Sequence, residues 1–181
     1  MSDATTFHFM GGPLDELADE SSPLFEAIGF ASASWSRLEI HVDALIVHIN
    51  STEHSKKLYV AGHPVSFSNK MKLLKRWFNQ HPPLSPYRDK MREIQSELRI
   101  LSSERNTFIH AIFEAWNAET QTALVHTFKY EGNDRFTSAK SEITLGGFVD
   151  FSIAVNHTNK ELWKISADLF TEDGIRLLET P

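Results

Sequence analysis

Four stretches of this chain carry apolar residues at the spacing of an α-helix, and they constrain its fold more than any other feature. They cover residues 22–50, 66–80, 85–112 and 147–174. Ser22-Pro23 and Ser85-Pro86 each place a hydroxyl N-cap before a proline, and Ser66 or Ser68 is suited to cap the second stretch. The second stretch ends at His81-Pro82, because the residue before a proline resists the helical region. Each stretch therefore predicts an amphipathic helix.

The apolar stripe of each predicted helix can be read directly from the residue spacing. In the first and fourth helices it consists of Trp35, Leu38, Val42, Leu45, Ile46 and Ile49, and of Phe151, Val155, Leu162, Ile165 and Leu169. In the second and third helices it consists of Phe67, Met71, Leu74 and Phe78, and of Ile94, Leu98, Leu101, Phe108 and Ile112. Helices with one apolar face bury it against each other, so we expect a mainly α fold, an up-and-down four-helix bundle.

Between the third and fourth helices the pattern changes to that of a small β-hairpin at about residues 115–145. Residues 123–130 are rich in β-formers, residues 131–134 read as a turn, and residues 135–145 read as the return strand. We expect one helical domain over residues 22–174, preceded by a flexible arm over residues 1–21 and followed by a tail over residues 175–181.

Composition excludes several classes of protein and site. The 181 residues contain no cysteine, so disulfides and thiolate zinc sites are ruled out. No apolar run is long enough for a transmembrane helix, and the N-terminus does not read as a secretory signal, so we expect a cytoplasmic protein. The net charge is −6, yet residues 56–105 hold eleven Lys or Arg and four acidic residues. That segment is either a set of solvated helix surfaces or a basic face toward phosphate.

Arg105 lies in the middle of the apolar stripe of the third helix. On a helical wheel, Leu98 and Ile109 fall within about 40° of it, whereas His110 falls about 140° away. Burying a guanidinium without partners costs several kcal/mol, so it requires an internal carboxylate or a ligand phosphate. Glu39, at the edge of the first helix's stripe, is the best internal partner. The residues alone leave both alternatives open.

The nine histidines raise the question of a metal site. His41 and His48 lie seven residues apart on one helix face, but no set of histidines and acidic residues has a recognisable ligand spacing. We therefore expect solvated or interface histidines, no metal site and no cofactor.

The segment Arg105-Asn106-Thr107-Phe108-Ile109-His110, late in the third helix, resembles the R-x-x-x-x-H signature of the HEPN superfamily. Three further features resemble bacterial HEPN-like proteins: the Trp35-x-x-x-Glu39 pattern, the Lys-rich second helix with Lys70 and Lys72, and the small hairpin. The resemblance covers about residues 22–173.

The resemblance implies a metal-independent endoribonuclease. Arg105 would hold and neutralise the scissile phosphate, His110 would move protons, and Asn106 would orient one of these groups. It also implies a homodimer through the Arg105–His110 helix, with RNA and a cognate antitoxin-like protein as partners. Under the same resemblance, Lys70 and Lys72 would bind the RNA substrate. Glu39 would support Arg105. The alternative is a non-catalytic helical interaction or scaffold module in which Arg105 forms a structural ion pair.

Overall fold

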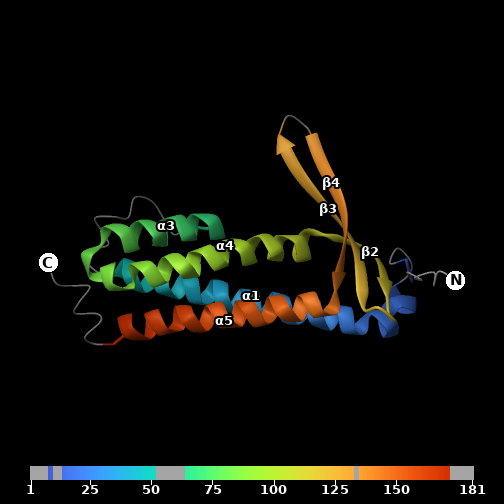
Figure 1. Cartoon of the computed structure of the whole chain (residues 1–181), viewed down its shortest axis with the longest axis horizontal. Helices are drawn as coiled ribbons and strands as arrows, with labels where there is room; N and C mark the ends of the chain where they lie inside the picture. Colours follow the sequence, from blue (N-terminus) through green and yellow to red (C-terminus); the bar gives the residue numbers. More distant parts are fainter. Residues whose placement is uncertain (1–7, 10–13, 52–63, 133–134, 172–181) are drawn as a thin grey trace. The chain divides into compact units, whose positions relative to one another are not determined.

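A computed structural model of the chain describes residues 8–9, 14–51, 64–132 and 135–171 (Figure 1). The helices are α1 (Leu14–Ser51), α3 (Phe67–Gln80), α4 (Arg88–His110) and α5 (Leu145–Leu169), with a 3-10 helix, η1 (Pro82–Tyr87), before α4. The strands are β1 (His8–Phe9), β2 (Ile112–Asn117), β3 (Thr122–Gly132) and β4 (Arg135–Thr144). The protein is therefore mainly helical, as the sequence predicts, and its small antiparallel sheet contains the predicted hairpin as β3 and β4.

The chain divides into two compact units. The first unit contains residues 1–34 and 102–153, and the second contains residues 35–101 and 154–181. Three helices, α1, α4 and α5, are divided between the units, with one segment of each helix in the first unit and the other segment in the second.

The sheet belongs to the first unit, where its described strands run in the order β1-β2-β3-β4, every neighbouring pair antiparallel. The β3–β4 pairing extends from Thr122 opposite Thr144 to Gly132 opposite Arg135. At the base of the sheet Trp116, Val125 and Ile143 are buried, whereas residues 137–142 of β4 are exposed. In Figure 1, β3 and β4 accordingly extend away from the helical segments of their own unit.

Aromatic side chains join α4 and α5 within the first unit. The Phe108 ring lies 4.7 Å from the Phe148 ring and 5.1 Å from the Phe151 ring, measured between centroids. Phe113, on β2, brings its ring to 6.4 Å from that of Phe148. Edge-on and tilted pairs at these separations are favourable beyond their burial alone, so Phe148 is the centre of this small core.

The second unit is held by contacts between successive helical segments. Asp43 of α1 pairs with Lys70 of α3, with Nζ 2.8 Å from the carboxylate. Gln95 of α4 donates to the Met71 carbonyl of α3 at 3.4 Å. Two further contacts complete the set: Thr158 of α5 donates to Glu97 of α4 at 3.0 Å, and His41 of α1 bonds to α5. Most residues of the predicted stripes of α1, α4 and α5 are buried in the corresponding segments.

Helix α3 is bounded as its sequence predicts. Ser66 is its N-cap, and the Ser66 hydroxyl accepts a hydrogen bond from the Asn69 N–H at 3.3 Å. The helix ends at Gln80, and the following residue, His81, has an extended backbone before Pro82. A side-chain cap and a pre-proline residue are local signals, which explains why both ends could be predicted.

Three predicted boundaries of α1 and α4 are wrong. Helix α1 begins at Leu14 and contains Pro23 in its interior, so Ser22-Pro23 does not start it. In the sequence, acidic residues follow Pro13, and negative charge is favourable near the N-terminus of a helix, which accounts for a start before Ser22. Part of α1 and strand β1 thus fall within the range predicted as an arm.

The other two errors concern α4. The prolines around Ser85-Pro86 form η1, so the α-helix begins at Arg88. The helix ends at His110, because Ile112 already pairs with His126 as the first residue of β2. Strands β1 and β2 were not predicted, and Ile112 belongs to the sheet instead of the helical stripe. The predicted end of the fourth helix at Gly174 is also wrong, because α5 ends at Leu169 and the next two residues are not helical; Gly174 itself lies outside the described residues.

Within the described residues, no helix combines the length and the hydropathy that crossing a membrane requires.

Candidate functional site

Arg105 lies on α4 in the first unit, among apolar side chains. It lines a small, open pocket. The other lining residues are Ile28, Ala31, Ser32, Phe108, Ile109, Phe148 and Phe151. Arg105 itself is half-buried. The helical wheel thus places this arginine correctly, beside apolar side chains.

Asn106 is the neighbour that the structure brings to the guanidinium. Arg105 Nη1 donates to Asn106 Oδ1 at 3.1 Å, and the Asn106 side chain is exposed. The amide oxygen therefore fixes one edge of the guanidinium at the surface. Two of the three residues predicted to carry catalysis are in direct contact.

His110 is the last residue of α4, and its side chain is exposed. Its ring forms no hydrogen bond or ion pair with another described residue. Since α4 is helical from Arg88 through His110, Arg105 and His110 project about 140° apart from one helix. A single α4 therefore presents the guanidinium and the imidazole in different directions.

The remaining predicted residues, Glu39, Lys70 and Lys72, all lie in the second unit. Lys70 is 7% exposed, and its ammonium group is paired with Asp43. Lys70 thus joins α3 to α1, and its positive charge is already paired with the negative charge of a carboxylate. Lys72 is exposed and Glu39 is half-buried. An Arg105–Glu39 pair stays a prediction.

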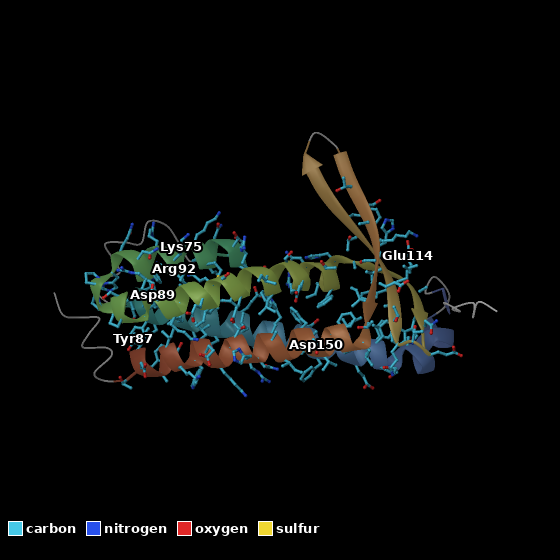
Figure 2. The ribbon with its side chains drawn as sticks, viewed as in Figure 1. Lys75, Tyr87, Asp89, Arg92, Glu114 and Asp150 are labelled. Atoms are coloured by element: carbon cyan, nitrogen blue, oxygen red, sulfur yellow. The ribbon has the colours of Figure 1, made fainter. Side chains whose placement is uncertain are left out.

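A charged cluster on the sheet was not predicted. Glu114 Oε1 accepts from His126 Nδ1 at 3.1 Å, and Glu114 Oε2 accepts from Lys140 Nζ at 2.6 Å. The hydrogen bond from Lys140, above all, lowers the pKa of the Glu114 carboxyl, against the opposing effect of burial. Figure 2 shows Glu114 where β2 meets the hairpin strands.

The backbone explains how these three residues meet. His126 and Lys140 are directly opposite in the β3–β4 register, and β2 has a register shift between Phe113 and Ala115 that places Glu114 beside them. The predicted hairpin could have indicated that His126 and Lys140 lie opposite each other. Glu114 could be found only by predicting β2.

His41 and His48 are interface histidines of the second unit. His41 is 7% exposed; its Nδ1 lies 2.8 Å from Asn159 Oδ1 and its Nε2 lies 2.9 Å from Ser166 Oγ. His48 Nε2 donates to the Leu169 carbonyl at 3.1 Å. Both rings therefore join α1 to α5. Among the described residues there is no group of three or more His, Cys, Asp or Glu side chains that could hold a metal ion.

Comparisons of the chain with protein-family models, with curated proteins and with solved structures find no match.

Proposed function

We propose that this chain is a HEPN-like domain and a metal-independent endoribonuclease whose site is formed by Arg105, Asn106 and His110. The observation that carries the proposal is the placement of Arg105. Arg105 lines a mainly apolar pocket, and its guanidinium is bonded to the exposed Asn106 amide, on the helix that ends at exposed His110.

The proposed reaction is attack of a ribose 2′-oxygen on the adjacent phosphorus. The 2′-hydroxyl loses its proton, the bond from phosphorus to the 5′-oxygen breaks, and that oxygen takes up a proton. The products are a 2′,3′-cyclic phosphate and a 5′-hydroxyl end. An arginine suits this chemistry because it binds phosphate through paired N–H groups and stabilises charge that develops on the phosphoryl oxygens.

Each residue has a distinct role in the proposal. The Arg105 guanidinium neutralises the scissile phosphate, and Asn106 holds that guanidinium in place. The His110 imidazole transfers a proton at the 2′- or the 5′-oxygen, as an imidazole can near neutral pH.

A homodimer through the C-terminal part of α4 would resolve the 140° separation of the two groups. A two-fold axis would bring Arg105 of one copy toward His110 of the other. The apolar surface beside the motif supports such a contact, since Ile109 is 40% exposed and Ile112 is 57% exposed. RNA and an antitoxin-like protein are the further partners in this proposal, and Lys72 is an exposed cation available to RNA.

The proposed fold is an up-and-down four-helix bundle. The paired contacts in the second unit support it, because α1 bonds to α3 and α5, and α4 bonds to α3 and α5. Such a set of four neighbour pairs is expected when four helical segments surround one core.

The alternative function is a non-catalytic interaction or scaffold module. The size of the pocket beside Arg105 favours it, because the space that the centre of a water molecule can occupy there is about 10 Å³. That is room for roughly one water. In this alternative Arg105 forms a structural ion pair and takes no part in catalysis.

Incubation with mixed RNA in EDTA distinguishes the two functions. We expect cleavage by the wild type and loss of cleavage in Arg105→Lys and His110→Ala. Arg105→Lys keeps the charge but removes the paired N–H groups. The matched controls are Arg99→Lys, an exposed arginine on the same helix, and His157→Ala, an exposed histidine on α5. Equal cleavage by all five proteins, or none by the wild type, would overturn the nuclease proposal.

A further inference from the structure

A second pocket, in the second unit, is lined largely by cations and amides. It is a shallow, open depression between α3 and α4, in which the centre of a water molecule can occupy about 20 Å³, so a bound phosphate would lie at its mouth. Its lining consists of Lys75, Phe78, Asn79, Arg88, Met91, Arg92 and Gln95. Three of the seven side chains are cationic, two are amides, and none is a carboxylate. Figure 2 labels Lys75 on α3 and Arg92 on the neighbouring α4.

The arginine at the start of α4 is held in a fixed position. Arg88 Nε donates to the Phe78 carbonyl at 3.2 Å, and Arg88 Nη2 donates to the Asn79 carbonyl at 3.3 Å. These carbonyls belong to the last turn of α3, where backbone acceptors need partners from outside the helix. The guanidinium has five N–H donors in a rigid fork, so N–H groups remain for a ligand. The Arg88 guanidinium is therefore already oriented as a donor before a ligand binds.

The other two cations are not neutralised by buried acids. Lys75 is exposed and forms no hydrogen bond or ion pair with another described residue. Arg92 pairs with Asp89 at 3.2 Å, but these two side chains are 69% and 88% exposed. An ion pair so open to solvent contributes little, and an anion can compete with it.

The two amides and the floor of the pocket add to its affinity for an oxyanion. Gln95 Nε2 donates to the Met71 carbonyl, which holds that side chain in place. Asn79 is exposed at the rim, whereas Phe78 and Met91 are 2% and 1% exposed and form the floor. An apolar floor lowers the local dielectric constant, so the attraction between the cations and an anion is stronger there than at an open surface.

We propose that this pocket binds a phosphate group. The chemistry that recognises it is an oriented arginine, two exposed cations and two amides around one opening, which suits a tetrahedral oxyanion. The exposed rim admits a phosphate that is part of a larger molecule. This site does not depend on the nuclease proposal, because all of its residues lie in the second unit and none of them has a catalytic role. The phosphate belongs either to a nucleic-acid backbone or to a small free molecule.

Two variants with equal charge test the proposal in the full chain. The pocket variant is Lys75→Gln with Arg92→Gln, which leaves Arg88 and the end of α3 intact. The control is Arg99→Gln with Lys160→Gln, two exposed cations that do not line the pocket. Each double variant removes two positive charges. Circular dichroism should show wild-type helix content in both, because the four substituted side chains are exposed.

Calorimetric titration with inorganic phosphate at constant ionic strength is the first measurement, and binding of a short single-stranded RNA is the second. We expect the pocket variant to bind one of these probes at least about tenfold more weakly than the control does, since each lost charge-assisted hydrogen bond costs about that factor. Selective loss of RNA binding identifies a backbone phosphate, and selective loss of inorganic phosphate alone identifies a free one. Equal weakening in both variants, or no binding of either probe by the wild type, would overturn the proposal. RNA cleavage by a pocket variant that no longer binds phosphate would leave the nuclease proposal standing.

Discussion

Replacing Phe148 by alanine should destabilise the first unit by several kcal/mol. The Phe148 side chain is fully buried, and its ring contacts those of Phe108 and Phe113. Deleting a buried phenylalanine ring costs about 3–5 kcal/mol, which includes the cavity that it leaves. The lost ring contact with Phe108 lies within that figure, at about 0.5–1.5 kcal/mol. We therefore expect a loss of about 4 kcal/mol.

Phe30→Ala is the matched control for this prediction. It removes the same ring from α1 in the same unit, but Phe30 is 60% exposed. Its loss should cost about 1 kcal/mol or less. The comparison therefore isolates burial from the chemistry of the substitution.

Urea denaturation followed by circular dichroism would measure both variants. With a slope of about 2 kcal/mol per molar urea, Phe148→Ala should lower the midpoint by about 2 M and Phe30→Ala by about 0.5 M or less. Hydrogen exchange would locate the change, with amides of β2 and the start of α5 losing protection first. Equal midpoint shifts for the two variants would refute the placement of Phe148 at the centre of this core.

Three further predictions concern the second unit. Lys70→Ala should cost about 1–3 kcal/mol in thermal or urea unfolding, because it removes a buried side chain and its ion pair with Asp43, whereas Lys72→Ala at an exposed position should stay within about 0.5 kcal/mol; equal losses would contradict the pairing. Ser66→Ala should cost about 1 kcal/mol through the lost cap of α3, and Ser68→Ala should cost less, as unfolding midpoints would show. Hydrogen bonds from Lys164 and then Lys90 lower the pKa of Glu161 from 4.5 to about 2, so its contribution to stability is present above pH 4.5 and is lost as the pH falls toward 2. NMR titration should show this low pKa, and Lys90→Ala should raise it; a Glu161 pKa near 4.5 in the wild type would contradict the assignment.

Local signals in the sequence were enough to predict most of the helical structure. The stripe of α1 is buried from Trp35 to Ile49, and that of α5 is buried from Phe151 to Leu169, as their helical spacing predicts. The Ser66 cap and the pre-proline end of α3 act within a few residues of their own positions. Such features depend little on the rest of the chain.

The parts that could not be predicted depend on contacts between distant residues. β2 becomes a strand because it pairs with β3 and β1, and β1 lies more than a hundred positions earlier in the chain. Pro23 is a local helix-start signal, but the surrounding helix overrides it. Sequence-based propensities include neither effect.

In the candidate site too, local features could be predicted from the sequence and contacts between distant residues could not. A helical wheel was enough to place Arg105 among apolar side chains, because that placement depends on one helix. The bond from Arg105 to Asn106 depends on side-chain rotamers, and the Glu114–His126–Lys140 cluster depends on strand register. The ion pair between Lys70 and Asp43 depends on which helices are neighbours. None of these three has a signature in the order of the residues.

The chemical nature of the RNA ends produced in EDTA tests the central claim most directly. Mass spectrometry of a defined RNA after incubation with the wild type should find 2′,3′-cyclic phosphate and 5′-hydroxyl ends, and these ends should be missing with Arg105→Lys and with His110→Ala. If the wild type leaves the RNA intact, or if either variant produces the same ends at the wild-type rate, Arg105 and His110 do not form a ribonuclease site.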